Sequence, residues 1–154
     1  MWTYKDSHQF DIPENAFGFV YLIECLLPGQ PKSKYLGKKQ LTASKIVSKR
    51  VLNKVGVKVT KKKKSRVESN WRDYMGSCKP LLEDIKRFGK ENYKFTILAF
   101  AETKGQLSFL EEYCQMREKV MIDDSYYNDS VGARGFIGVK FTETFKETIR
   151  GIKI

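Results

Sequence analysis

Residues 17–27 read FGFVYLIECLL, a run rich in β-branched and aromatic side chains, and Pro28 and Gly29 follow it directly. An apolar run of this length that ends in turn-forming residues is typical of a buried β-strand. A shorter run at residues 34–37 reads KYLG and comes after a loop rich in Pro, Gly, Ser and Lys. We therefore predict that the two runs pair as a β-hairpin.

The rest of the chain alternates between helical and extended patterns. Thr42 is placed to cap a helix over residues 43–53, because Ala43, Val47 and Val51 recur every four residues. Further downstream the patterns predict a protruding ribbon at 55–67, a helix at 77–88, a strand at 92–100 and a long helix at 106–122. The predicted fold class is α/β (α+β), with a small, mainly antiparallel three-stranded sheet (17–27, 34–37 and 92–100) flanked by helices and an inserted basic ribbon or loop.

A chain of 154 residues has the usual length of one domain. We expect an N-terminal arm over residues 1–15, a domain over 16–130 with a basic insertion at about 43–68, and a C-terminal tail over 131–154. No window approaches the ~18 consecutive apolar residues of a transmembrane helix, and the three cysteines form no paired motif. We therefore expect a cytoplasmic protein with reduced thiols and no membrane association.

Positive charge is concentrated in one segment. The chain has 29 lysines and arginines against 18 acidic residues, a formal net charge of +11. Between Glu24 and Glu68 there are fourteen basic residues and no acidic one, so the rest of the chain has a net charge of −3. Such a segment repels itself unless a polyanion binds it.

Three interpretations of this basic segment are open. A solubilising surface usually mixes both signs of charge, and this segment does not. An acidic membrane surface is bound by a helix with an apolar face, which is missing here. Nucleic acid is the partner that the pattern favours. Aromatic residues able to stack on bases, and equally able to belong to the core, are Trp2, Tyr4, Trp71 and Tyr74.

Few catalytic groups are available to the chain. His8 is the only histidine, which excludes paired-histidine metal centres, HExxH metalloproteases and HNH nucleases. In the helix predicted over 106–122, Glu111 lies at the border of the apolar face, whereas Glu112 falls on the polar face and is expected to be fully solvated. From the residues alone, Glu111 is either an edge residue whose carboxylate reaches water or a ligand that points into a cleft, and the first is favoured.

Short motifs recur in a characteristic order along the chain. They are GFVY at 18–21, YLG at 35–37, NWRDYMGS at 70–77, FGKENYKF at 88–95, LE at 110–111 and YYN at 126–128. In this order they resemble the GIY-YIG nuclease family, and in particular its phage-type members. The resemblance spans about residues 16–129 and implies a metal-dependent DNA endonuclease that hydrolyses phosphodiester bonds.

The resemblance also implies roles for individual residues. Tyr21 and Tyr35 match the two motif tyrosines, which position or deprotonate the attacking water. Glu111 matches the metal-ligand glutamate, so that one hard cation, Mg²⁺ or alternatively Mn²⁺, would lie between it and the scissile phosphate. Asn128 matches an asparagine that orders the site. With the resemblance, a metal ligand becomes the favoured interpretation of Glu111, in place of an edge residue.

Two departures from the family pattern affect these expectations. The first motif has one extra residue between its glycine and its tyrosine, and the phosphate-holding arginine of the family has no unique match. Arg50 is our choice because it falls on the helix predicted over 43–53, and Arg66 is the alternative. Lys38 and Lys39, directly after Gly37, could share this role. The predicted nucleic-acid contacts are Lys38, Lys39, Lys61, Lys62, Lys63, Lys64, Arg66 and Trp71.

The leading hypothesis is therefore a single-metal endonuclease acting on DNA, expected to be double-stranded. A non-cleaving nucleic-acid-binding module of the same fold is the alternative. A structural RNA-associated basic protein has the least support. A homodimer is an open option, and a phage-encoded chain would act in the cytoplasm of the host cell.

Overall fold

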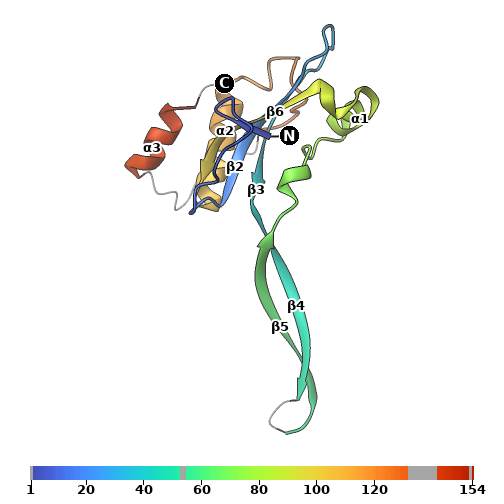
Figure 1. Ribbon diagram of the computed structural model, residues 1–154, viewed down its shortest axis with the longest axis vertical. Helices are drawn as coiled ribbons and strands as arrows, with labels where there is room; N and C mark the ends of the chain where they lie inside the picture. The colour runs from blue at the N-terminus through green and yellow to red at the C-terminus, as the bar shows by residue number, and fades with distance from the viewer. Residues whose placement is uncertain (1, 53–54, 132–141, 153) are drawn as a thin grey trace.

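The structure, a computed structural model, describes residues 2–52, 55–131, 142–152 and 154, except for the side chains of Leu52, Lys61 and Lys64. Figure 1 shows a body built around one sheet, from which a long two-stranded ribbon extends alone. The elements are β1 (Trp2–Tyr4), β2 (Gly18–Cys25), β3 (Lys34–Gln40), β4 (Thr42–Leu52), β5 (Lys58–Glu68), α1 (Lys79–Phe88), β6 (Tyr93–Ala101), α2 (Lys104–Arg117) and α3 (Glu143–Arg150), with short 3₁₀ turns at Trp71–Asp73 and Lys90–Asn92.

The main sheet has the strand order β1-β6-β2-β3. The predicted hairpin is present, because β2 and β3 pair antiparallel from Gly18↔Gln40 to Glu24↔Lys34. β6 pairs antiparallel with the other side of β2, and its register shifts between Val20 and Tyr21. The α+β fold class is confirmed. The sheet also has a fourth strand, β1, which pairs parallel with β6 and comes from the segment expected to be an arm.

The central strand β2 is buried on both faces, which explains its nearly continuous apolar run. On one face, Phe19 and Tyr21 pack in a cluster that includes side chains of α1 and both tryptophans. On the other face, Val20 and Leu22 pack against α2 and α3. The sheet thus separates two cores, and β1 and β3 are its edge strands.

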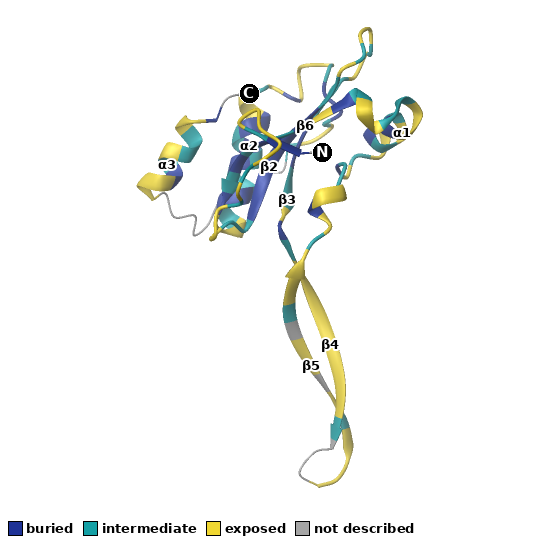
Figure 2. Ribbon diagram, in the orientation of Figure 1, coloured by how far each residue is buried: buried dark blue, intermediate teal, exposed yellow. Residues whose placement is uncertain are grey.

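The helix predicted over 43–53 is wrong, because residues 43–52 lie in the strand β4, and residue 53 lies outside the described part of the chain. β4 pairs antiparallel with β5 along its whole length, from Thr42↔Glu68 to Leu52↔Lys58, and the two strands form the ribbon. The four-residue spacing of Ala43, Val47 and Val51 does not distinguish the two structures, since a strand also places every second residue on one face. Figure 2 shows that the ribbon is largely exposed.

The helices differ in extent and burial from the prediction. α2 begins after Thr103, whose Oγ1 accepts a hydrogen bond from the Gln106 amide at 3.1 Å, and it ends at Arg117 instead of residue 122. Glu112, expected to be solvated, is buried. The C-terminal segment covers α2 from a second side, with the Phe109 and Phe145 ring centroids 6.0 Å apart. In the described part of the chain, no helix is both long and apolar enough to cross a membrane.

Candidate active site

A cleft of about 490 Å³ opens beside the edge strand β3. Its walls come from four separate parts of the chain: β3, the start of α1, α2 and the segment that follows residue 125. Three of the predicted catalytic residues line it, namely Tyr35, Glu111 and Asn128. Side chains separated by up to 93 positions in the sequence therefore meet at one surface.

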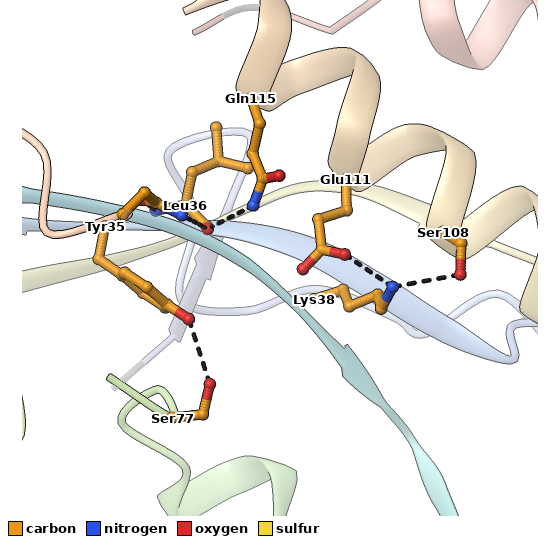
Figure 3. Close-up of polar contacts among 8 residues, drawn as sticks. Tyr35, Leu36, Lys38, Ser77, Ser108, Glu111 and Gln115 are labelled. Atoms are coloured by element: carbon orange, nitrogen blue, oxygen red, sulfur yellow. Dashed lines mark hydrogen bonds and ion pairs between the residues drawn. The ribbon is translucent and has the colours of Figure 1, made fainter. Parts of the chain in front are cut away.

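Tyr35 presents its ring and hydroxyl to this cleft from β3. The Tyr35 Oη atom lies 3.2 Å from Ser77 Oγ, just before α1, as Figure 3 shows. Burial raises the pKa of Tyr35 more than the hydrogen bond to Ser77 lowers it. The phenol is therefore protonated at neutral pH, and it can donate one hydrogen bond to a group in the cleft.

Tyr21 lies behind Tyr35 and does not reach the surface. Its side chain is 1% exposed, and its ring centroid is 6.2 Å from that of Tyr35 and 6.0 Å from that of Tyr74. Burial is the largest cause that raises its pKa well above the ordinary value. Tyr21 pairs with Gly37, where a Cβ atom would lie 2.7 Å from Tyr21 Oη. The glycine thus leaves the space that the buried tyrosine occupies.

Glu111 reaches the cleft from α2 and forms an ion pair. Its Oε2 atom is 2.7 Å from Lys38 Nζ, and Lys38 also donates to Ser108 Oγ at 3.1 Å. Figure 3 shows Lys38 extending from the sheet toward the helix that carries both partners. The Glu111 side chain is 17% exposed, which agrees with its predicted border position. The carboxylate is oriented by a cation yet remains open to the solvent side.

Asn128 holds the backbone of β3 between the tyrosine and the glycine of the second motif. Its Oδ1 accepts from the Leu36 amide at 3.0 Å, and its Nδ2 donates to the Leu36 carbonyl at 2.8 Å. Gln115 Nε2 donates to the same carbonyl at 3.3 Å (Figure 3). Asn128 therefore orders the edge strand. We did not predict Gln115, although its position one helical turn after Glu111 was the available signal.

A comparison with protein families agrees with this arrangement. A family model described as "Putative endonuclease segE, GIY-YIG domain" matches residues 2–131, most of the chain. The chain belongs to the GIY-YIG nuclease family. No curated protein and no solved structure gives a significant match. Membership supports nuclease function in general and a nucleic acid as the substrate.

Neither predicted arginine lies at the cleft of this GIY-YIG domain. Arg50 pairs with Thr60 far along the ribbon, so its expected helical placement is wrong, and Arg66 pairs with Ser44 near the ribbon base. Among the described residues that line the cleft there is no arginine. The cations at or beside it are Lys79, which lines it, and Lys38, which pairs with Glu111.

The other predicted nucleic-acid contacts are divided between the ribbon and the body. Trp71 is 3% exposed and donates from Nε1 to Glu68 at 2.9 Å, so its indole belongs to the core and is not available for stacking on a base. Lys39 lies over the Tyr74 ring at 4.0 Å, and burial lowers its pKa. Lys62, Lys63 and Arg66 are exposed on β5, whereas the side chains of Lys61 and Lys64 lie outside the described part of the structure.

The donor groups at the cleft fit one magnesium ion shared with a substrate. Among the described residues no three His, Cys, Asp or Glu side chains form a ready-made metal cluster. Glu111 and Asp129 are the carboxylates of the cleft, and the Asn128 oxygen is already taken by the Leu36 amide. Mg²⁺ is commonly bound through one or two carboxylates together with phosphate and water oxygens. A complete cage of protein ligands is therefore not required.

Proposed function

We propose that this GIY-YIG protein is an endonuclease that hydrolyses phosphodiester bonds of double-stranded DNA with a single metal ion. The observation that carries the proposal is the meeting of Tyr35, Glu111 and Asn128 at one cleft. These residues come from β3, α2 and the segment after it, and each matches a family motif. If these residues only stabilised the fold, a tyrosine and a glutamate would not need to line the same open cleft.

Tyr35 is the side chain that would contact the attacking water. Because burial raises its pKa, the hydroxyl is neutral at pH 7 and orients the water by a hydrogen bond. Tyr21 is too buried to touch the substrate, and its ring supports that of Tyr35 from behind. In hydrolysis the water oxygen bonds to phosphorus while the bond to the leaving oxygen breaks. The attacking water would give its proton to solvent in the open cleft, and the leaving oxygen would take up one proton from solvent, so that the protons balance.

Glu111 would hold Mg²⁺, or Mn²⁺, at the cleft. When bound, such an ion withdraws charge from the scissile phosphate and stabilises the leaving oxygen. Glu111 would then exchange its Lys38 partner for the ion, and the freed ammonium of Lys38 would contact a phosphate oxygen. In this proposal Lys38, which we expected only to share the phosphate-holding role, takes it in place of Arg50 or Arg66.

A non-cleaving nucleic-acid-binding module remains the second candidate. Two observations favour it: the Glu111 carboxylate already has a cationic partner, and no described residue lining the cleft is an arginine. Such a module would bind DNA with the same dependence on salt but would give no metal-dependent product. The two candidates therefore differ in one measurable quantity, the rate of strand cleavage.

The test of the proposal is the nicking of supercoiled plasmid in Mg²⁺ by wild type, Tyr35→Phe and Tyr113→Phe. Tyr113 is the matched control because it loses the same hydroxyl from α2, where its ring stacks on Phe109. We expect wild type and Tyr113→Phe to nick at the same rate and Tyr35→Phe to be at least about 10²-fold slower. Equal rates for all three proteins would indicate a contaminating nuclease and overturn the proposal, as would binding of DNA without any product.

A further inference from the structure

The ribbon formed by β4 and β5 is attached firmly to the body at its base. Leu41, between β3 and β4, is 6% exposed, and its amide donates to the Phe17 carbonyl at 3.0 Å. On the other strand, the Ser69 amide donates to the Leu41 carbonyl at 2.8 Å, and Ser69 Oγ donates to the Gln40 carbonyl at 2.6 Å. Since β3 leads directly into the ribbon, the ribbon has a defined direction relative to Lys38 and the cleft.

Cations occupy both faces of the ribbon. Directly paired residues share a face, and successive residues alternate between faces. One face therefore presents Lys45, Lys49 and Lys63, and the other presents Arg50, Lys58, Lys62 and Arg66. All seven of these side chains are exposed. A protein that binds a flat anionic surface gains only from cations on one face.

Cations on two opposite faces suit an anion that lies on both sides of the ribbon. The major groove of B-form DNA has a phosphate backbone along each wall and is wide enough for a two-stranded β-ribbon. The major groove of A-form RNA is too narrow for side chains to enter. A lipid surface would meet one face only. Of these polyanions, a DNA duplex is the one that the charge distribution fits.

The length of the ribbon sets how far along the duplex it extends. From Thr42 to Leu52 there are ten steps of about 3.3 Å, which gives a length of about 33 Å. One helical turn of B-form DNA advances by about 34 Å, or about ten base pairs. Because the major groove winds around the axis, its path over one turn is longer than this axial rise, so the ribbon is long enough to follow the groove for part of one turn.

We propose that the ribbon lies in the major groove of a DNA duplex and extends over part of one helical turn to one side of the cleft. The proposal rests on the proposed function, because the cleft defines the phosphate from which this distance is counted. The exposed lysines and arginines would contact phosphates on both walls. A duplex long enough to contact the whole ribbon would then be bound with much higher affinity than a short duplex.

The test is the binding of labelled DNA in EDTA, where no cleavage occurs. In the ribbon variant Lys49, Arg50, Lys58, Lys62 and Lys63 are replaced by Gln. In the matched body variant Lys86, Arg87, Lys90, Lys104 and Lys119 are replaced by Gln, which changes the net charge equally. Both are compared with wild type on a duplex of about 24 base pairs, a DNA hairpin with a stem of about six base pairs, the RNA version of the long duplex, and anionic vesicles.

On the long DNA duplex, we expect the ribbon variant to lose most of its affinity and the slope of log K against log salt to fall by up to about 4.5. The body variant should bind nearly as wild type does, and the ribbon variant should lose little on the short stem. Equal losses in the two variants, an equal loss on both DNA lengths, or wild-type binding to RNA or vesicles as tight as to DNA would overturn the proposal. Binding in EDTA does not depend on cleavage, so the two failures can be told apart. Wild type that binds through the ribbon but gives no product in Mg²⁺ contradicts only the proposed function, whereas wild type that nicks DNA while the ribbon variant binds equally well contradicts only this proposal.

Discussion

The ion pair between Lys38 and Glu111 shows how one contact can prepare a site for a cation. The ammonium and the carboxylate are 2.7 Å apart, and their side chains are 35% and 17% exposed. An ion pair this close to solvent contributes little net stability, because water competes for both charges. In the proposed reaction the carboxylate can therefore exchange Lys38 for a metal ion at a small cost in folding free energy.

A second residue, Cys114, makes the stability of the protein depend on pH. The thiol is fully buried in α2, and burial raises its pKa from 9.0 to about 12. Since the folded pKa lies above the unfolded one, the stabilising contribution is complete below pH 9 and is lost as the pH rises from 9 toward 12. Between pH 8 and 10 this amounts to about 1 kcal/mol.

The measurement is urea unfolding of wild type and Cys114→Ala at pH 8, 9 and 10. The alanine variant is expected to be less stable at pH 8, because it leaves a cavity in the core. From pH 8 to pH 10, the free energy of unfolding of the alanine variant should fall by about 1 kcal/mol less than that of wild type. The tyrosines are present in both proteins and cancel in the comparison. Parallel pH dependence of the two proteins would contradict the assignment to Cys114.

At the scale of elements, the pairing of β2 with β3 depends on a close approach at Gly37. A Cβ atom there would lie 2.7 Å from Tyr21 Oη and 3.0 Å from Tyr35 Cε1. Gly37→Ala must therefore displace an aromatic ring, and overpacking of this kind typically costs 1–3 kcal/mol. The control is Gly151→Ala, because the nearest atom to its Cβ is a backbone oxygen at 3.4 Å.

Chemical denaturation of the two glycine variants distinguishes these cases. We expect the unfolding midpoint of Gly37→Ala to fall clearly, with a loss of about 1–3 kcal/mol, and that of Gly151→Ala to stay within about 0.5 kcal/mol of wild type. If Gly37→Ala were as stable as wild type, the close packing of β2 against β3 would not be a constraint on the second motif.

The ribbon shows where local patterns alone are insufficient. The hairpin of β2 and β3 could be predicted, since its strands are bounded by turn residues and buried by both cores. For β4, a four-residue spacing of apolar residues fits a helix and a strand equally well. The decisive interaction is the pairing with β5, whose partner residues lie up to 26 positions away. Short-range periodicity does not contain that information.

At the scale of the whole molecule, the candidate site could be predicted in part. The order of the motifs identifies Tyr35, Glu111 and Asn128 as candidate site residues, and in the structure all three line one cleft. The sequence indicates Lys38 and Lys39 as cations that could share the holding of the phosphate. The preference for Arg50 depends on a helix beside the cleft, whereas residues 43–52 form a strand that leads away from it. The burial of Glu112 could not be predicted, because it depends on the C-terminal segment that covers α2.

The molecule as a whole combines a nearly neutral body with one strongly cationic ribbon. Of its two proposed functional parts, the cleft and the ribbon, each rests on its own set of residues. Glu111 can therefore be changed without changing any ribbon cation, and the ribbon can be changed without changing the cleft. This separation makes cleavage and binding independently measurable in one protein.

The most direct test of the central claim is the single-turnover nicking rate of Glu111→Gln in Mg²⁺, measured at the same occupancy of DNA as wild type. Glu83→Gln is the matched control, because it removes one exposed carboxylate from α1 with the same change of charge. The account predicts that Glu111→Gln is at least about 10³-fold slower than wild type and that Glu83→Gln is unchanged. Wild-type nicking by Glu111→Gln would contradict the assignment of the catalytic centre to this cleft.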